Sequence, residues 1–475
     1  MDTKKLRQKI LDLAIRGKLV PQDPNDEPAS VLLERIRAEK EQLIKEGKFK
    51  RSKKSAASDT SHYENVPFEV PGNWCWVKVA DISSVIVYGV SESAKSEGKF
   101  KLLRITDIQD NAVNWNTVPY TDYPESKSEN YILQAGDILF ARTGATVGKS
   151  YLVDDAVPEN AIYASYLIKV RVSNMIIPQY VKYFFESGFY WEQIANNSVG
   201  VGQPNVNGSS LGNLWVPIPP IQEQRRIVDK LVSWCLMIDK ISVNQELITQ
   251  QIEELRNHIL NLAISGKLVA QEPSDEPAIE LLKRINPMFS PTHNRHYANV
   301  PYKVPQKWQW VTLSDISNYG ECINVPVSNI PENSWILELE DIEKDSGRLI
   351  QRMNRSKKNI NGVRHSFKKG DVLYSKLRTY LNKVLVADQD GYCTTEIIPI
   401  TCVPGIVPEY LCHVLRSRYY VDYTISLGYG VKMPRLGTAD ALKSMIPVPP
   451  YEEQRRIVKS VNEIYHKLEQ ISSEL

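Results

Sequence analysis

The sequence predicts an α+β (mixed α/β) fold in which two globular domains are joined by two long antiparallel coiled-coil helices, with a pseudo-twofold internal repeat in a circular arrangement. Three observations support this expectation. The 475-residue chain carries one series of sequence blocks twice, a heptad pattern runs through its middle, and pieces of the same pattern stand at both ends. An internal repeat constrains the architecture more strongly than any local signal.

Four blocks make up the repeat, and they follow in the same order in both copies. LRQKILDLAIRGKLVPQDPNDEPASVLLERI from Leu6 returns without a gap as LRNHILNLAISGKLVAQEPSDEPAIELLKRI from Leu255. The other three recur in similar form. They are ENVPFEVPGNWCWVKVADIS from Glu64 and ANVPYKVPQKWQWVTLSDIS from Ala298, GDILFAR from Gly136 and GDVLYSK from Gly370, and VPIPPIQEQRRIV from Val216 and IPVPPYEEQRRIV from Ile446. The shared order indicates duplication of one unit.

A long helical pattern follows Pro219 and Pro220 in the middle of the chain. Its apolar residues alternate four and three positions apart, with Gln245 in one polar slot. They are Ile227, Leu231, Trp234, Ile238, Ile241, Ile248, Ile252, Leu255, Ile259 and Leu262. A heptad repeat sustained over this length predicts a coiled coil, and Gly266 is typical of a helix end.

The two ends of the chain carry matching pieces of this pattern. The C-terminal end repeats its first half and the N-terminal end its second half, through Ile457, Val461, Ile464, Leu468, Ile471 and Leu475, and through Leu6, Ile10 and Leu13. Together the termini would complete a second long helix, antiparallel to the first, as in a circle that has been cut open. An independent oligomerisation zipper is the alternative interpretation.

These patterns divide the chain into six segments. They are a repeated helical segment with a basic linker (1–63), a globular domain (64–215), the central helix (216–266), a repeated helical segment with a short linker (267–297), a second globular domain (298–445) and a C-terminal helix (446–475). Each globular domain is expected to combine short strands, such as 137–142 and 371–376, with helices over 178–194 and 408–425. The cluster at 48–55 is interpreted as an exposed basic tether, with phosphate contact as the alternative.

Composition narrows the class of protein. Lys and Arg total 58 and Asp and Glu 56, for a net charge of +2, so nucleic-acid binding would require charges segregated onto one face. No apolar run is long enough for a membrane helix and no signal segment follows the N-terminus, which predicts a cytoplasmic protein. The six cysteines form no Cys-x-x-Cys pair, so we expect reduced thiols. Trp74, Trp76, Trp308 and Trp310 are interpreted as core aromatics.

The sequence contains only partial matches to catalytic and metal-binding motifs. The segment 144–150 (GATVGKS) is similar to a phosphate loop, but three residues instead of four separate its glycines. The segment 286–289 (NPMF) is similar to a methyltransferase motif but stands alone, and is interpreted as a helix terminator. The pair His293 and His296 lacks further ligands for a metal. We therefore expect no catalysis by this chain, with a phosphate-loop enzyme as an alternative.

The repeated blocks resemble the DNA specificity subunit of type I restriction–modification enzymes over nearly the whole chain. The markers are Pro-x-Pro-Pro-x-x-Glu-Gln-Arg-Arg-Ile at 217–227 and 447–457, GDILFARTG at 136–144 and GDVLYSKLR at 370–378. The resemblance implies two target recognition domains, each reading one half of an asymmetric bipartite site in double-stranded DNA. It also implies that the helices set the half-site spacing and dock two modification (methyltransferase) subunits, with restriction (translocase/nuclease) subunits as further partners.

The resemblance assigns the chemistry to those partners. They would methylate adenine at N6 with S-adenosylmethionine and cleave DNA with ATP and Mg²⁺, and this chain would carry no cofactor, no metal and no catalytic residue. A coiled-coil adaptor that binds proteins is the alternative function. Sequence-specific retention of DNA would discriminate between the two.

Loops beside the repeated strands carry donors suited to bases and phosphates. The candidate DNA-binding residues are Lys101, Arg104, Arg142, Thr143, Lys149, Gln203, Asn205, Asn207, Arg364, His365, Lys376, Arg378, Tyr380, Asn382, Lys383, Lys432 and Arg435. The candidate partner-binding residues are Glu223, Gln224, Arg225, Arg226, Glu453, Gln454, Arg455 and Arg456. A solvated surface charge is the alternative for each DNA candidate. For the arginines that begin the long helices, the alternative is ion pairing with Glu223 or Glu453.

Overall fold

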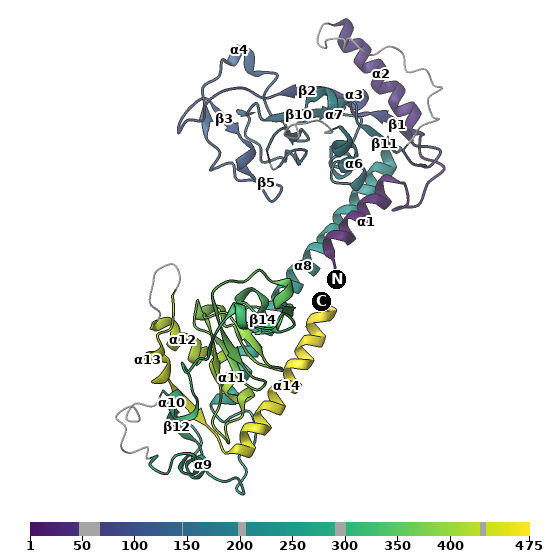
Figure 1. The fold of residues 1–475 in the computed structure, drawn as a ribbon. Helices are drawn as coiled ribbons and strands as arrows, with labels where there is room; N and C mark the ends of the chain where they lie inside the picture. Colours follow the sequence, from purple (N-terminus) through teal and green to yellow (C-terminus); the bar gives the residue numbers. More distant parts are fainter. Residues whose placement is uncertain (47–66, 145, 198–205, 290–300, 428–433) are drawn as a thin grey trace. The chain divides into compact units, whose positions relative to one another are not determined.

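The computed structural model describes residues 1–46, 67–144, 146–197, 206–289, 301–427 and 434–475 (Figure 1). These residues form two compact units, Met1–Asn244 and Gln245–Leu475, which agree with the duplicated halves of the sequence. The boundary falls inside the central helix α8 (Ile221–Ile264), so each unit contains one part of it. The finer six-segment division remains a prediction. The basic cluster at 48–55 and the histidine pair of 293–296 lie outside the described residues.

A helix from the start of the chain packs along α8 in the first unit. Figure 1 shows α1 (Thr3–Ile15), in purple, beside the teal helix α8. Ile10 of α1 and Leu231 of α8 are buried in one core. Arg7, in the first turns of α1, forms an ion pair with Asp239, late in this unit's part of α8. The two helices therefore run antiparallel.

A helix from the end of the chain packs along α8 in the second unit. The hydroxyl of Tyr465, in α14 (Tyr451–Glu474), donates to the carbonyl of Arg256 at 3.2 Å. Farther along α14, the Leu475 carbonyl accepts a hydrogen bond from the side chain of Gln245. Higher numbers in α14 thus meet lower numbers in α8. The predicted antiparallel pairing of the two chain ends with the two parts of the central helix is confirmed.

The buried side of α8 departs from the predicted heptad in the second unit. Leu255 is 43% exposed and Ile471 of α14 is 48% exposed, so their predicted seam positions are wrong. Leu260 and Ala263 are buried instead, and they share one core with Trp308. Here α8 packs against the globular part of its unit as well as against α14. A helix covered on two sides buries a wider face than a two-position coiled-coil seam.

The strands of the first unit are short. They are β1 (Cys75–Lys78), β2 (Ser83–Tyr88), β3 (Phe100–Leu103), β4 (Ile108–Gln109), β5 (Ala112–Val113), β6 (Tyr120–Thr121), β7 (Ile138–Ala141), β8 (Ser150–Leu152), β9 (Ala161–Tyr163), β10 (Leu167–Val172) and β11 (Trp215–Ile218). They form sheets with the orders β2-β10-β7-β8 and β6-β3-β9, and the pairs β1-β11 and β4-β5. β3 and β9 are parallel, and the other pairs are antiparallel.

The second unit repeats part of this plan. Its strands are β12 (Gln309–Thr312), β13 (Asn324–Pro326), β14 (Trp335–Leu337), β15 (Met353–Asn354), β16 (Val363–Phe367), β17 (Val372–Ser375), β18 (Val384–Val386), β19 (Gly391–Cys393), β20 (Ile397–Ile400) and β21 (Met445–Val448). The pair β12-β21 and the sheet β18-β17-β20 match β1-β11 and the β8-β7-β10 part of the first unit. In the five-stranded sheet β13-β16-β19-β14-β15, the part β19-β14-β15 matches β9-β3-β6, and the copies diverge in the added strands β13 and β16.

Short helices complete each unit. In the first they are α2 (Ala29–Lys45), α3 (Val79–Ile82), α4 (Glu125–Ser128), α5 (Pro178–Phe184), α6 (Gly188–Asn197) and α7 (Gly208–Gly212). In the second they are α9 (Ala278–Ile285), α10 (Leu313–Ile316), α11 (Pro408–Arg416), α12 (Arg418–Ser426) and α13 (Thr438–Leu442). Single-turn 3-10 helices are η2 (Ile105–Asp107), η5 (Val327–Asn329), η6 (Leu339–Asp341), η7 (Arg355–Lys357) and η8 (Thr379–Leu381).

The single helices expected over 178–194 and 408–425 are each two helices. Ser187 separates α5 from α6, and Ser417 separates α11 from α12. Each hydroxyl donates to a carbonyl three residues back and accepts an N–H three residues ahead. A serine that satisfies backbone groups in both directions caps the following helix and allows the chain to turn.

Other sequence expectations have clear outcomes. The phosphate-loop alternative is wrong, because β7 leads into β8 and the two strands pair antiparallel, whereas a phosphate loop leads into a helix. Asn286 caps the C-terminus of α9, which confirms the helix terminator. All four predicted core tryptophans are buried. The six cysteines are free. Within the described ranges, no helix combines the length and apolarity that crossing a membrane requires.

Candidate nucleic-acid interface and helix junctions

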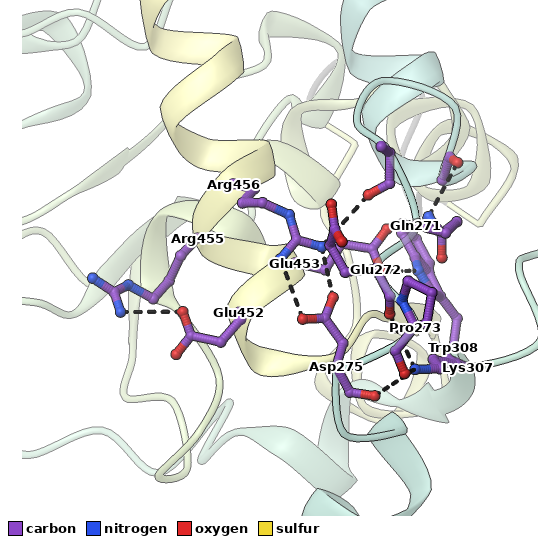
Figure 2. Close-up of polar contacts among 12 residues, drawn as sticks. Gln271, Glu272, Pro273, Asp275, Lys307, Trp308, Glu452, Glu453, Arg455 and Arg456 are labelled. Atoms are coloured by element: carbon purple, nitrogen blue, oxygen red, sulfur yellow. Dashed lines mark hydrogen bonds and ion pairs between the residues drawn. The ribbon is translucent and has the colours of Figure 1, made fainter.

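A polar cluster holds the start of α14 to the globular part of its own unit. We name this cluster the second junction, and it consists of Gln271, Asp275, Trp308, Glu453 and Arg456 (Figure 2). Trp308 Nε1 donates to Glu453 Oε2 at 2.9 Å, and Gln271 donates to the other oxygen of this carboxylate. Arg456 donates two hydrogen bonds to Asp275, of 2.6 and 3.2 Å. Three sequence segments therefore meet at the first turn of the helix.

The start of α8 is held in the same way by the first junction, made of Gln22, Asp26, Trp74, Glu223 and Arg226. Trp74 Nε1 donates to Glu223 Oε2 at 2.9 Å, and Gln22 donates to the other carboxylate oxygen. Arg226 donates two hydrogen bonds to Asp26, of 2.5 and 3.2 Å. Each residue occupies the repeat position of its counterpart, so the junction is a property of the duplicated unit.

A buried glutamine follows each junction glutamate. Gln224 Oε1 accepts the N–H of Ile177 at 3.0 Å, and Gln454 Oε1 accepts the N–H of Val407 at 2.8 Å. Each glutamine also donates to a proline carbonyl five residues back. Ile177 and Val407 are the N-cap residues of α5 and α11. The glutamine therefore connects the start of a long helix to the start of a helix in the globular part.

Burial raises the pKa of the carboxyls of both Glu223 and Glu453. Removal from water disfavours the charged form of a carboxyl group. The hydrogen bonds from the tryptophan and glutamine of each junction act in the opposite direction and lower the pKa. Each junction carboxylate thus depends on its two donors for the stabilisation that water would otherwise provide.

A glycine makes the turn into each junction. Gly17 follows α1 with φ +66°, and Gly266 follows α8 with φ +70°. A Cβ atom at Gly17 would lie 2.4 Å from Cγ of Pro71, and one at Gly266 would lie 2.3 Å from Cγ of Pro305. Only glycine combines this left-handed backbone with such a close approach.

A cation and two tyrosines gather beyond β7 in the first unit. The Arg142 guanidinium lies over the ring of Tyr88, 4.9 Å from its centroid. The Tyr88 hydroxyl accepts the N–H of Gly208 at 2.8 Å. Tyr166 is 62% exposed, and its carbonyl accepts the N–H of Arg142 at 3.0 Å. A cation stacked on the Tyr88 ring makes a surface suited to nucleic acid.

A different polar group occupies this place in the second unit. Arg435 donates two hydrogen bonds to the carboxylate of Glu396, of 2.9 and 3.1 Å. These bonds from Arg435 hold the pKa of Glu396 below its ordinary value. Lys376 follows β17 and donates its N–H to the Glu396 carbonyl at 3.0 Å. Arg378 has a left-handed backbone, with φ +51°, and its N–H donates to the Pro434 carbonyl.

Comparison with known proteins finds a matching family model and similar proteins. The family model described as type I restriction modification DNA specificity domain matches residues 71–254. The specificity subunit of the type I restriction enzyme EcoAI from Escherichia coli is 26% identical, over 97% of this chain and 88% of that protein. The EcoEI specificity subunit from Escherichia coli is 25% identical, over 99% of this chain and 90% of that protein. Over nearly its whole length the chain is therefore similar to the specificity subunits of type I restriction enzymes.

Solved structures show the same fold. The HsdS subunit from Thermoanaerobacter tengcongensis aligns with a TM-score of 0.52 at 18% identity, over 86% of this chain and 93% of that one. A chain from a study of complex assembly in the type I R-M system aligns with a TM-score of 0.54 at 18% identity, over 86% and 94%. The mixed helix-and-sheet fold of this chain is therefore shared with these solved structures.

Four of the predicted partner-binding residues face inward. Glu223, Gln224 and Gln454 are 0% exposed and Glu453 is 1% exposed. Their prediction as partner contacts is wrong, because their polar atoms are used inside the chain. The sequence pattern identified the block that begins each long helix but could not show which side of the helix start is covered.

The arginines of the same block divide into two pairs. Arg226 and Arg456 bind Asp26 and Asp275, so the predicted ion pairs with the junction glutamates are wrong for them. Arg225 and Arg455 are exposed. Arg455 pairs with the neighbouring Glu452 at 3.3 Å. Partner binding by Arg225 and Arg455 stays a prediction.

One predicted DNA contact is wrong. His365 is buried, and its Nδ1 lies 3.0 Å from the carbonyl of Ile397. Burial lowers the pKa of this histidine, so the ring is held neutral in the core. A buried ring cannot reach a base edge or a phosphate. Its neighbour Arg364 pairs with Glu338 at 3.0 Å and is largely covered.

Several other candidates use their polar groups within the chain. These bonds are Arg104 to the Asp107 carboxylate, Lys101 to the Val118 carbonyl, Lys383 to the Leu339 carbonyl, Asn382 to the Arg416 carbonyl and the Ser210 N–H to Asn207. Lys101 lies in β3 and Arg104 directly follows it, whereas Arg142 follows β7 in a different sheet. The structure thus separates candidates that the sequence grouped only by charge.

The remaining candidates keep accessible groups or cannot be placed. Lys149, Tyr380 and Arg435 are exposed, and Arg142, Thr143, Lys376 and Arg378 are half-buried. Gln203, Asn205 and Lys432 lie outside the described residues. DNA contact by all of these stays a prediction. Tyr88, Tyr166 and Glu396 were missed, because neither an isolated tyrosine nor a glutamate carries a sequence signal for this surface.

Proposed function

We propose that this chain selects the DNA sequence on which a type I restriction–modification complex acts, with each unit reading one half of an asymmetric bipartite site. One observation carries the proposal: the same framework occurs twice with different side chains at equivalent positions. Arg142 and Tyr166 stand in the first unit where Lys376 and Glu396 stand in the second. Base edges are distinguished by the donors and acceptors that meet them, so two such surfaces select different sequences.

The specificity subunit acts with DNA and with the other subunits of its restriction–modification system. The long helices would set the half-site spacing and dock two modification subunits, and the exposed Arg225 and Arg455 at the helix starts support this. Restriction subunits would join the same complex. Base flipping and adenine methylation with S-adenosylmethionine, and cleavage with ATP and Mg²⁺, would belong to those partners.

A domain exchange tests the proposal. Residues 64–215 are replaced by the corresponding domain of a relative with a known target, and methylated adenines are mapped in cells that also express the modification subunits. One half of the methylated motif should change and the other half should stay. The matched exchange of 298–445 should change the opposite half. A motif that stays the same, or that changes in both halves after one exchange, contradicts the proposal.

A further inference from the structure

One backbone position is held in the same way in both units. In the first unit Arg142 donates its N–H to the Tyr166 carbonyl at 3.0 Å, and its own carbonyl accepts the N–H of Val206 at 3.1 Å. These two bonds tie the residue after β7 to the residue before β10 and to the segment before α7. The backbone of Arg142 is thereby fixed by main-chain contacts that do not depend on its side chain.

The second unit repeats the arrangement with different residues. Lys376 donates its N–H to the Glu396 carbonyl at 3.0 Å, and its own carbonyl accepts the N–H of Leu436 at 2.9 Å. The segments are again those after β17, before β20 and before α13. The framework therefore presents one position per unit at which the side chain can change while the backbone stays.

The side chain of Arg142 is prepared for a planar contact. Its Nε is buried and has no hydrogen-bond partner in the described part of the chain. The ring of Tyr88 lies beneath it at 4.9 Å and restrains its plane. The two terminal nitrogens are the donors that remain. Two parallel donors match the O6 and N7 acceptors of guanine in the major groove.

The residue at the equivalent position of the second unit, Lys376, offers no such fork. Arg435 donates hydrogen bonds from Nε and one terminal nitrogen to the carboxylate of Glu396. Glu396 occupies the position equivalent to Tyr166. Lys376 carries a compact ammonium instead of a planar guanidinium. The charge is similar in the two units, but the geometry of the donors differs. A phosphate would accept either arrangement, whereas a base edge would distinguish them.

We propose that the position of Arg142 and Lys376 determines one base of each half-site, with Arg142 reading a guanine in the half read by the first unit and Lys376 reading a different base in the other half. Tyr88 is a positioning residue that orients the guanidinium of Arg142. The inference rests on the proposed function, since it assigns a base contact within a recognition domain.

The test uses Arg142→Lys in the full chain, assembled with its modification subunits. Methylation rates are measured on a panel of duplexes in which each base of the bipartite site is replaced in turn. Arg142→Lys keeps the charge but removes the fork. We expect discrimination at one guanine of one half-site to fall by a factor on the order of 10–100, while discrimination at every other base stays.

Two outcomes would overturn the inference. An equal fall in methylation rate on all duplexes would indicate that Arg142 contacts a phosphate. Unchanged methylation rates on every duplex would indicate that Arg142 does not contact the DNA. Lys376→Arg is the matched variant, and it should alter one base of the opposite half-site only. If Arg142→Lys fails to fold, Lys376→Arg decides, and an unchanged second half-site rejects the inference. A wild-type complex without any bipartite preference would instead reject the proposed function.

Discussion

Trp308 donates its indole N–H to Glu453 across 2.9 Å, although 145 residues separate the two in the chain. The equivalent pair of the other unit has the same length, since Trp74 Nε1 lies 2.9 Å from Glu223 Oε2. Each pair joins the residue just before the first strand of a globular part to the first turn of a long helix. The orientation of that part on its helix therefore depends on a buried charge and its donors.

Loss of the indole donor should destabilise one unit. In Trp74→Phe the buried Glu223 carboxylate keeps only the donor from Gln22. An unsatisfied buried acceptor costs about 1–3 kcal/mol, so the free energy of unfolding of the first unit should fall by that amount. Urea unfolding of the full chain measures the change. Trp191→Phe is the control, because Trp191 is 37% exposed and should have little effect.

The glycine turns should tolerate no side chain. Gly266→Ala would place Cβ 2.3 Å from Pro305 and would hold alanine at φ +70°. We expect the second unit to lose about 1–3 kcal/mol of stability, measured by denaturant unfolding. Gly72→Ala is the matched control, because a Cβ there meets nothing within 4 Å. An equal effect of both substitutions would contradict the steric explanation.

A buried histidine should make the second unit sensitive to acid. Burial lowers the pKa of His413 from 6.5 to about 3, with Arg416 acting in the same direction. The folded pKa lies below the unfolded one, so the unfolded state binds the proton first and stability falls as pH falls from 6.5 toward 3. Between about pH 7 and pH 5 the loss should be about 2 kcal/mol.

The variant His413→Leu provides the control for this pH dependence. It removes the titrating ring, so its stability should change less than that of the wild type over the same range. The carboxyl groups titrate in both proteins and cancel in the comparison. Parallel pH profiles for the two proteins would show that His413 is not the source.

The exposed arginines should matter for assembly and not for folding. Arg225→Glu and Arg455→Glu reverse charges at the starts of the long helices, where both side chains are exposed. If the modification subunits dock there, the affinity for them should fall by roughly tenfold with no change in melting temperature. Titration of the subunits against each variant measures this. Lys459→Glu, farther along α14, is the charge-matched control, and an equal loss there would point to net charge alone.

The repeat made much of this fold predictable. Duplicated blocks located the two units, the heptad located α8, and the split pattern at the ends located α1 and α14 as its antiparallel partners. Periodicity works here because a helix buries residues that are near one another in sequence. It failed at Leu255, where α8 is covered from a second side by residues far away in the chain.

The candidate site was predictable only in part. The sequence by itself determined the resemblance to type I specificity subunits, the framework position of Arg142 and Lys376, and the block that begins each long helix. Only the tertiary structure decided that Glu223 and Glu453 face inward to tryptophans, that His365 is buried, and that Arg142 and Arg435 differ in their neighbours. The physical reason is that charge and residue type are local properties, whereas burial and hydrogen-bond partners are set by segments that meet only after folding.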